Sequence, residues 1–208
     1  GMLNTDWGDY GHLCQPSFSV PGILYGAAFA WNAEGLTYEE VNRAVSFLAY
    51  GDRSGRFMEA FDALSFHEVF DWFHMVRWIE AGDAEKRHAI YNDPELNLTG
   101  LTEANAQVDA ALAQLREASV ELDSAHRSIL HDLHLAAEGV KLLNDLGAYV
   151  GAVEEGRSLP HREGPELAAA LESWYHAYVE NWRRVSKEST LARTRSVICA
   201  WADYLRGR

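Results

Sequence analysis

The chain has few of the residues and segments that usually mark a redox, zinc-binding or membrane protein. It contains only two cysteines in 208 residues, Cys14 and Cys199, without the spacing of a zinc site or a disulfide framework. We therefore expect two reduced thiols, which suits a cytoplasmic protein. No apolar run approaches the ~20 residues that span a bilayer. No charged-then-apolar leader is visible either, so we expect neither a membrane nor a secretory role.

Basic residues are also scarce. The chain has 18 lysines and arginines against 31 acidic residues, which gives a formal net charge of −13 at pH 7. Because this balance repels a phosphate backbone, we do not expect nucleic acid as a partner. The composition is 48% hydrophobic and 12% aromatic, enough to build a core and to exclude disorder as the overall state.

Only five prolines interrupt the chain, and apolar positions recur at helical spacing over long stretches. The prediction is an all-α helical bundle of about seven or eight helices with one short N-terminal extended segment, where residues 3–7 could form a strand. The expected helices are Pro21–Trp31, one capped by the Thr37-x-x-Glu40 box and ended near Gly51, about 56–64, about 66–80, one capped by Thr102, about 125–152, one from Pro165, and about 190–206.

Two features of these expected helices concern burial. The helix Pro21–Trp31 is apolar nearly all round and is predicted to be buried. Two later helices carry apolar stripes that should face a core. These stripes are Val108, Leu112, Leu115, Ala118 and Leu122 in the first, and Leu167, Leu171, Trp174, Tyr178 and Val185 in the second.

Histidines and acids at helical spacing are candidates for metal binding. The two sets are His131, His134 and Glu138 on one expected helix, and His67, Asp71 and His74 on another. At 100° per residue, however, Arg127 and Lys141 fall within the same arc of about 80° as the first set. Such cations would repel a metal ion, and a mixed stripe of this kind is typical of a solvated face. We expect no metal ligands, and a metal-binding helical bundle is the second alternative function.

Other familiar chemistry is missing from the sequence. There is no GxSxG elbow and no Cys-His signature, and the run Gly51–Gly55 lacks the preceding strand and the GK[ST] ending of a phosphate-binding loop. We assign no catalytic residue, expect no cofactor and interpret Gly51–Gly55 as a helix–helix turn. The aromatic residues at helical spacing are expected in the core, although surplus apolar surface would also allow a homodimer. They are Trp72, Phe73, Trp78, Trp174, Trp182 and Trp201.

The segment Asn4–His12 differs from the rest of the chain. Its Trp, Asp, Tyr and His residues crowd a glycine-rich turn that follows the possible strand. Such a turn leaves side chains at the carboxyl end of a strand, where barrel enzymes hold their sites. Tryptophan faces stack on sugar rings and carboxylates accept hydrogen bonds from sugar hydroxyls.

A family resemblance rests on this segment and the helix after it. Thr5-Asp6-Trp7-Gly8-Asp9-x-Gly11-His12, followed by Pro21-Gly22-x-x-x-Gly26-Ala27-x-x-Ala30-Trp31-Asn32, resembles the end of the catalytic barrel in glycoside hydrolase family 20. That family contains the β-N-acetylhexosaminidases. Residues 41–64 and, more loosely, 182–191 are similar to the helical tail of some bacterial members. The resemblance implies that residues 1–35 are a remnant of the end of a (β/α)₈ barrel and residues 36–208 an α-helical C-terminal domain.

The resemblance also implies a sugar site. Trp7 would line the subsite for an N-acetylhexosamine, and Asp9 would hydrogen-bond the outer hydroxyls of the sugar. Many relatives carry Glu at the position of Asp9. In that family, an Asp-Glu pair polarises the 2-acetamido group of the substrate and protonates the leaving oxygen. The pair belongs to an earlier barrel strand, which this chain does not show. We therefore expect the C-terminal part of a β-N-acetylhexosaminidase-like glycoside hydrolase, inactive alone, with a companion barrel chain or a second copy as partner. The first alternative is a non-catalytic helical interaction or dimerisation module.

Overall fold

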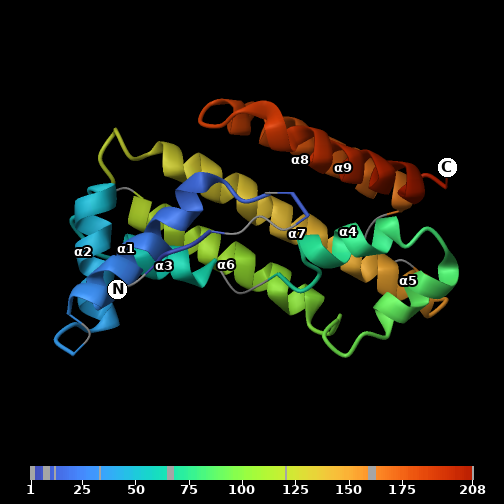
Figure 1. Ribbon diagram of the computed structural model, residues 1–208, viewed down its shortest axis with the longest axis horizontal. Helices are drawn as coiled ribbons and strands as arrows, with labels where there is room; N and C mark the ends of the chain where they lie inside the picture. The colour runs from blue at the N-terminus through green and yellow to red at the C-terminus, as the bar shows by residue number, and fades with distance from the viewer. Residues whose placement is uncertain are drawn as a thin grey trace. The chain divides into compact units, whose positions relative to one another are not determined.

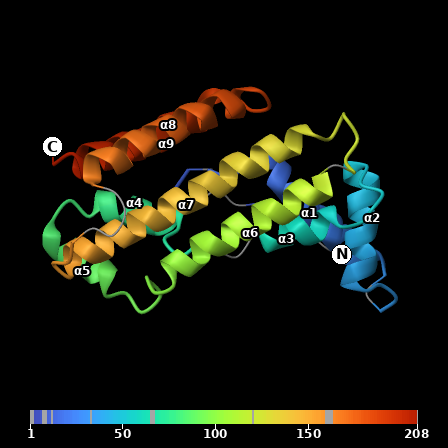
Figure 2. The ribbon, with the colours of Figure 1, turned by 180° about the vertical axis from the view of Figure 1, so that it is seen from behind.

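The computed structural model confirms the all-α fold. It describes residues 3–6, 10–11, 13–32, 34–64, 68–119, 121–158 and 163–207. These ranges form helices only, without a strand (Figures 1 and 2). In order, the elements are η1 (Pro16–Phe18), α1 (Ser19–Trp31), α2 (Tyr38–Tyr50), α3 (Phe57–Ala63), α4 (Trp72–Glu80), α5 (Ala84–Tyr91), α6 (Leu101–Ser119), α7 (Ser128–Glu154), α8 (Gly164–Arg183), η2 (Glu188–Thr190) and α9 (Leu191–Leu205). None of these helices is both long and apolar enough to cross a membrane.

The chain divides into two compact units. Unit 1 comprises residues 1–7, 14–66 and 107–134, and unit 2 comprises residues 8–13, 67–106 and 135–208. Helices α6 and α7 contribute to both units, because the division falls within each of them. The expected boundary after residue 35 concerns the resemblance to a barrel and stays a prediction.

Local sequence signals determine several helix ends. The Thr37 hydroxyl accepts the Glu40 N–H at 3.2 Å and the Glu40 carboxylate accepts the Thr37 N–H at 2.8 Å, which confirms the predicted capping box. Gly51 ends α2 with a φ of 67°, a left-handed conformation that glycine adopts without strain. The Asp71 carboxylate caps α4 by accepting the His74 N–H at 2.8 Å.

Some predicted boundaries are wrong. Because Asp71 caps it, α4 begins at Trp72 and not at residue 66. Helix α6 begins at Leu101, so Thr102 lies inside its first turn instead of capping it. Helix α8 ends at Arg183, which leaves Val185 outside the predicted core stripe and 67% exposed. The short helix α5, capped by Asp83, was not predicted, because eight residues give too weak a periodic pattern.

Unit 1 is built around the α2–α3 turn. Phe57 and Met58 are fully buried, and the Phe57 ring lies 4.6 Å from that of Tyr50. The buried Asp52 carboxylate accepts hydrogen bonds from the Ser54 hydroxyl at 2.7 Å and the Phe57 N–H at 2.8 Å. The predicted helix–helix turn at residues 51–55 is therefore confirmed, and buried backbone donors are satisfied by one carboxylate.

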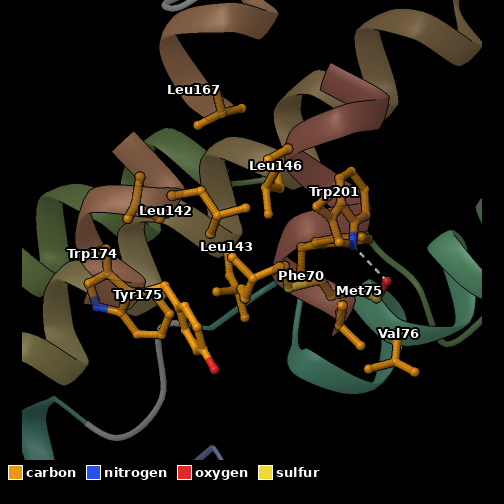
Figure 3. Packing of buried hydrophobic residues seen from close by; sticks show 14 of the residues in the cluster. Phe70, Met75, Val76, Leu142, Leu143, Leu146, Leu167, Trp174, Tyr175 and Trp201 are labelled. Carbon is orange, nitrogen blue, oxygen red and sulfur yellow. Dashed lines mark hydrogen bonds between the residues drawn. The ribbon is translucent and has the colours of Figure 1, made fainter. Parts of the chain in front are cut away.

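Unit 2 holds the largest group of buried hydrophobic residues (Figure 3). Helices α8 and α9 lie side by side in both ribbon views, and α9 also contacts α4. The Trp201 indole is fully buried and donates a hydrogen bond to the Met75 carbonyl at 2.9 Å. The α8 stripe from Leu167 to Tyr178 is buried as predicted. Most of the aromatic residues expected in the core are therefore found there.

The fully buried Asn144 of α7 links three segments of unit 2. Its amide oxygen accepts the Val69 N–H at 2.8 Å, and its amide nitrogen donates to the Asn105 oxygen at 2.9 Å. Asn105 in turn donates to Asp145 at 3.2 Å. This network joins α6, α7 and the segment before α4, and gives buried polar groups the partners that they need.

The N-terminal region departs from the sequence predictions. Residues 3–6 form no strand, because the described part of the chain offers no second strand for pairing. The burial predicted for Pro21–Trp31 is wrong, since Pro21 is the one buried residue of α1. A helix that is apolar all round needs covering on more than one side, and α1 does not have that here.

Candidate functional site

Trp7 and Asp9, which the resemblance assigns to sugar binding, lie outside the described residues, as does His12. The segments on either side are described. Residues 3–6 belong to unit 1, and residues 10–11 belong to unit 2. The two segments are therefore described separately, each within its own unit.

Residues 3–6 lie against α1. The Asn4 amide donates to the Ile23 carbonyl at 3.2 Å, and the Ser19 hydroxyl donates to the Asp6 carboxylate at 2.5 Å. A Cβ on Gly26 would collide with the Asn4 side chain, so the bare glycine permits this close approach. Gly26 of the Pro21–Asn32 motif thus has a direct packing role.

Tyr10 is held against α4. Its ring contacts Phe73 edge-on at a centroid distance of 5.2 Å, and its carbonyl accepts the Trp72 indole N–H at 3.4 Å. The Arg77 guanidinium lies 5.0 Å from the centre of the Phe73 ring. Tyr10 and Phe73 keep part of their surface exposed. A partly open aromatic surface with a guanidinium beside it thus adjoins the end of the motif.

Two carboxyl groups with opposite titration behaviour lie at the start of α4. Partial desolvation of the carboxyl group and the negative charge of the nearby Asp71 raise the pKa of Glu68 to about 7, although part of the residue's surface stays exposed. Burial also opposes ionisation of Asp71, but hydrogen bonds from the His74 ring and backbone N–H outweigh it and lower the pKa of Asp71. The Asp71 Oδ1 and His74 Nδ1 atoms are 2.7 Å apart.

This cluster can both accept hydrogen bonds and exchange a proton near neutral pH. Asp71 is the ionised acceptor that orients the buried His74 ring, and Glu68 is the group that titrates. From the sequence, Asp71 and His74 are candidates for metal binding, and neither Asp71 nor Glu68 is assigned to a catalytic pair. The available signal was the helix-capping aspartate, which brings the residues before α4 close to its first turn.

The described residues contain no group of three or more His, Cys, Asp or Glu side chains that could hold a metal ion. His131 and Glu138 are exposed and His134 is half-buried, so this stripe of α7 is solvated only in part. His67 of the second set lies outside the described residues.

Each unit also carries surface hollows away from this cluster. In unit 1, a hollow of about 320 Å³ between α1 and α2 is almost wholly apolar, with Leu24, Val41 and Leu48 in its walls. In unit 2, a hollow of about 390 Å³ opens at the start of α6 beside Asp145 and Arg157. A larger groove of about 680 Å³ lies along α8 and α9.

Comparisons of the chain with protein-family models, curated proteins and solved structures give no match. The arrangement of the residues themselves is therefore the basis for a functional proposal.

Proposed function

We propose that the chain is the C-terminal helical part of a glycoside hydrolase family 20-like protein, related to the β-N-acetylhexosaminidases, and that α1 is the last helix of its barrel. The supporting observation is the exposure of α1. Its 13 residues include no charged side chain, yet Pro21 alone is buried and Trp31 is 92% exposed. Leaving apolar surface in water costs about 25 cal/mol per Å². A helix of this kind is expected to pack against further polypeptide.

The apolar surface continues from α1 onto α2. Phe47 and Leu48 are exposed, and Leu48 also lines the apolar hollow between the two helices. A barrel helix packs one side on strands and its flanks on neighbouring helices. The extent of this surface therefore supports covering by a barrel that lies in other polypeptide, either in the same protein or in a companion chain.

In this proposal, Trp7 and Asp9 form part of the subsite for an N-acetylhexosamine. Of the residues around them, Asn4 and Asp6 hydrogen-bond to α1 within unit 1, and the Tyr10 carbonyl accepts the Trp72 indole N–H within unit 2. We assign no acid of this chain to the family's catalytic Asp-Glu pair, so the isolated chain binds sugar without hydrolysing it.

The test combines turnover and binding with the purified chain. We expect no release of 4-nitrophenol from 4-nitrophenyl N-acetyl-β-D-glucosaminide above the rate of the Trp7→Ala variant. N-acetylglucosamine should perturb the NMR signals of residues 4–11, and Trp7→Ala should abolish this response. The matched control is Trp31→Ala, which removes the exposed tryptophan of α1 and should leave the response intact. Turnover that depends on Trp7, or a response identical in both variants, would contradict the proposal.

A second function, self-association as a non-catalytic module, is favoured by the same exposed surface. A second copy could cover α1 and α2 in place of a barrel. Light scattering over a range of concentrations would show a dimer that the double variant Ile23→Lys, Leu48→Lys dissociates. The Leu3→Lys variant, changed at an equally exposed leucine off these helices, serves as the control. Dimerisation without any sugar response would favour this function over the first.

A further inference from the structure

The outward side of the α8–α9 pair carries a groove that neither proposed function uses. Its volume is about 680 Å³, and both helices line it. Along α8 it extends from Glu172 to Arg183, which at 1.5 Å per residue is about 16 Å, or three helical turns. The floor is apolar and the rim is charged. The floor residues are Tyr175, Val179, Leu191 and Ile198.

The floor of the groove is well supported from below. The Tyr175 hydroxyl lies 3.0 Å from both the Leu191 carbonyl and the Thr194 hydroxyl, so its polar atom is satisfied within the α8–α9 pair. Trp174, next to Tyr175 on α8, belongs to the hydrophobic core of unit 2 (Figure 3). A floor fixed in this way presents apolar surface with little loss of conformational freedom on binding.

The segment that forms the α8–α9 turn and α9 is basic, in contrast to the rest of the chain. Seven of the 18 lysines and arginines, but only two of the 31 acidic residues, lie in residues 183–208. Several of these cations are already used. Ion pairs join Arg183 to Glu188, Arg193 to Glu80 and Arg206 to Glu172.

Three other cations remain available near the groove. Among the described residues, no acidic side chain pairs with Arg195 on the rim or with Arg184 and Lys187 at the turn. Val185, between the latter two in the sequence, is exposed. The groove therefore combines an apolar floor with unneutralised positive charge.

We propose that this groove docks an acidic amphipathic helix of a partner protein. Three turns accommodate anchors at positions i, i+3 or i+4, and i+7 of such a helix, which is the usual spacing of helix-in-groove recognition. Glutamates or aspartates beside these anchors would meet Arg195, Arg184 and Lys187, where opposite charge steers association. This proposal is independent of the sugar site and of the covering of α1.

The chemistry disfavours two other occupants. Nucleic acid would be repelled by the remaining chain, which holds 29 of the 31 acidic residues. A second copy offers α1 as its least covered helix, but α1 carries no acidic residue to meet the cations. An acidic partner helix satisfies both the floor and the rim.

The test uses a fluorescein-labelled synthetic peptide of 14 residues, with leucine at the anchor positions and glutamate beside them. Fluorescence anisotropy should show saturable binding that weakens as salt is raised. Arg195→Glu should weaken binding about tenfold, equal to about 1.4 kcal/mol. The matched control is Arg53→Glu, which makes the same charge change in the exposed α2–α3 turn and should leave binding unchanged. A peptide with lysine in place of glutamate should not bind.

Cys199 provides a second readout, because it is exposed and lines the groove. In the Cys14→Ser background, the acidic peptide should slow the reaction of Cys199 with 5,5′-dithiobis(2-nitrobenzoate). Ala192→Trp, which fills the groove from an exposed position, should abolish both binding and protection while circular dichroism stays unchanged. If this variant fails to fold, protection of Cys199 by the peptide in the Cys14→Ser chain still shows whether the groove is occupied.

Any one of four binding or protection results would overturn the proposal. They are unchanged binding by Arg195→Glu, no peptide protection of Cys199, equal binding of the lysine peptide, and tighter binding of a single-stranded DNA oligonucleotide than of the acidic peptide. A concentration-dependent dimer that Arg195→Glu dissociates, without peptide binding, would assign the groove to a second copy and also overturn it.

Discussion

Helices α1 and α9 are similar in length but differ in how they are covered. Of the 15 residues of α9, seven are buried, whereas α1 buries one of its 13. Helix α9 has an apolar stripe against α4 and α8 and a polar opposite side. Helix α1 is uncharged all round and has neighbours on only part of its surface. The comparison shows that apolar content alone does not predict burial, because burial needs a partner for each apolar face.

The largest expected effect contrasts two tryptophans from these helices. Trp201→Ala should destabilise the protein by about 3–5 kcal/mol, because it removes a fully buried side chain and leaves the Met75 carbonyl without its indole donor. Trp31→Ala should change the free energy of unfolding by less than about 0.5 kcal/mol, because Trp31 is almost fully exposed. Urea denaturation followed by circular dichroism measures both. Equal destabilisation would mean that α1 is covered within the chain.

A smaller effect is expected where unit 2 depends on a buried amide. Asn144→Ala should cost about 2–3 kcal/mol, because the half-buried Val69 N–H and the Asn105 oxygen lose their partner. Asn97→Ala is the control, since Asn97 is exposed and serves only Thr99 in its own loop. Hydrogen exchange of the Val69 amide should accelerate in the first variant alone. Comparable urea midpoints for the two variants would show that the network contributes little.

In unit 1, the capping box should contribute about 1 kcal/mol. Thr37→Ala removes the acceptor for the Glu40 N–H at the start of α2, and Thr37→Ser should restore most of the stability. Thr102→Ala is the matched control, because Thr102 lies inside the first turn of α6 and does not cap it. Thermal unfolding monitored by circular dichroism checks the three variants. A loss in the Thr102 variant as large as in the Thr37 variant would show that the loss does not come from the cap, because alanine itself favours the helix.

The smallest expected effect is a pH dependence at Glu68, because solvent around its exposed side chain weakens the effect of its charge on stability. Because its pKa is about 7 in the folded chain, above the ordinary value, the unfolded state releases this proton first and folding stability falls between about pH 4.5 and 7. Glu68→Gln removes the titratable carboxyl group. The free energy of unfolding of the variant should therefore equal that of the wild type at pH 4.5 and exceed it increasingly as the pH rises. Urea titrations at pH 4.5, 6 and 8 measure the difference. A constant difference across these values would contradict the assigned pKa.

Much of the helical fold could be predicted from the sequence. The Thr37 box, the Gly51–Gly55 turn and the buried stripe of α8 are short-range patterns, and each is confirmed. The candidate site was less predictable. The contact of Tyr10 with Phe73 joins positions 63 residues apart, and no periodic pattern reports such a contact. The pKa of Glu68 likewise depends on groups that only folding brings together.

The sequence by itself determined the helical class, most helix ends and the acidic charge balance, because these depend on composition and on neighbours within one or two turns. The assignment of Trp7 and Asp9 to an N-acetylhexosamine site remains a proposal that rests on the motif. Only the tertiary structure decided which apolar helix is covered, which carboxyl titrates near neutral pH and where positive charge adjoins an apolar groove. Burial and electrostatics at these positions arise from residues distant in sequence, so they exist only once the chain is packed.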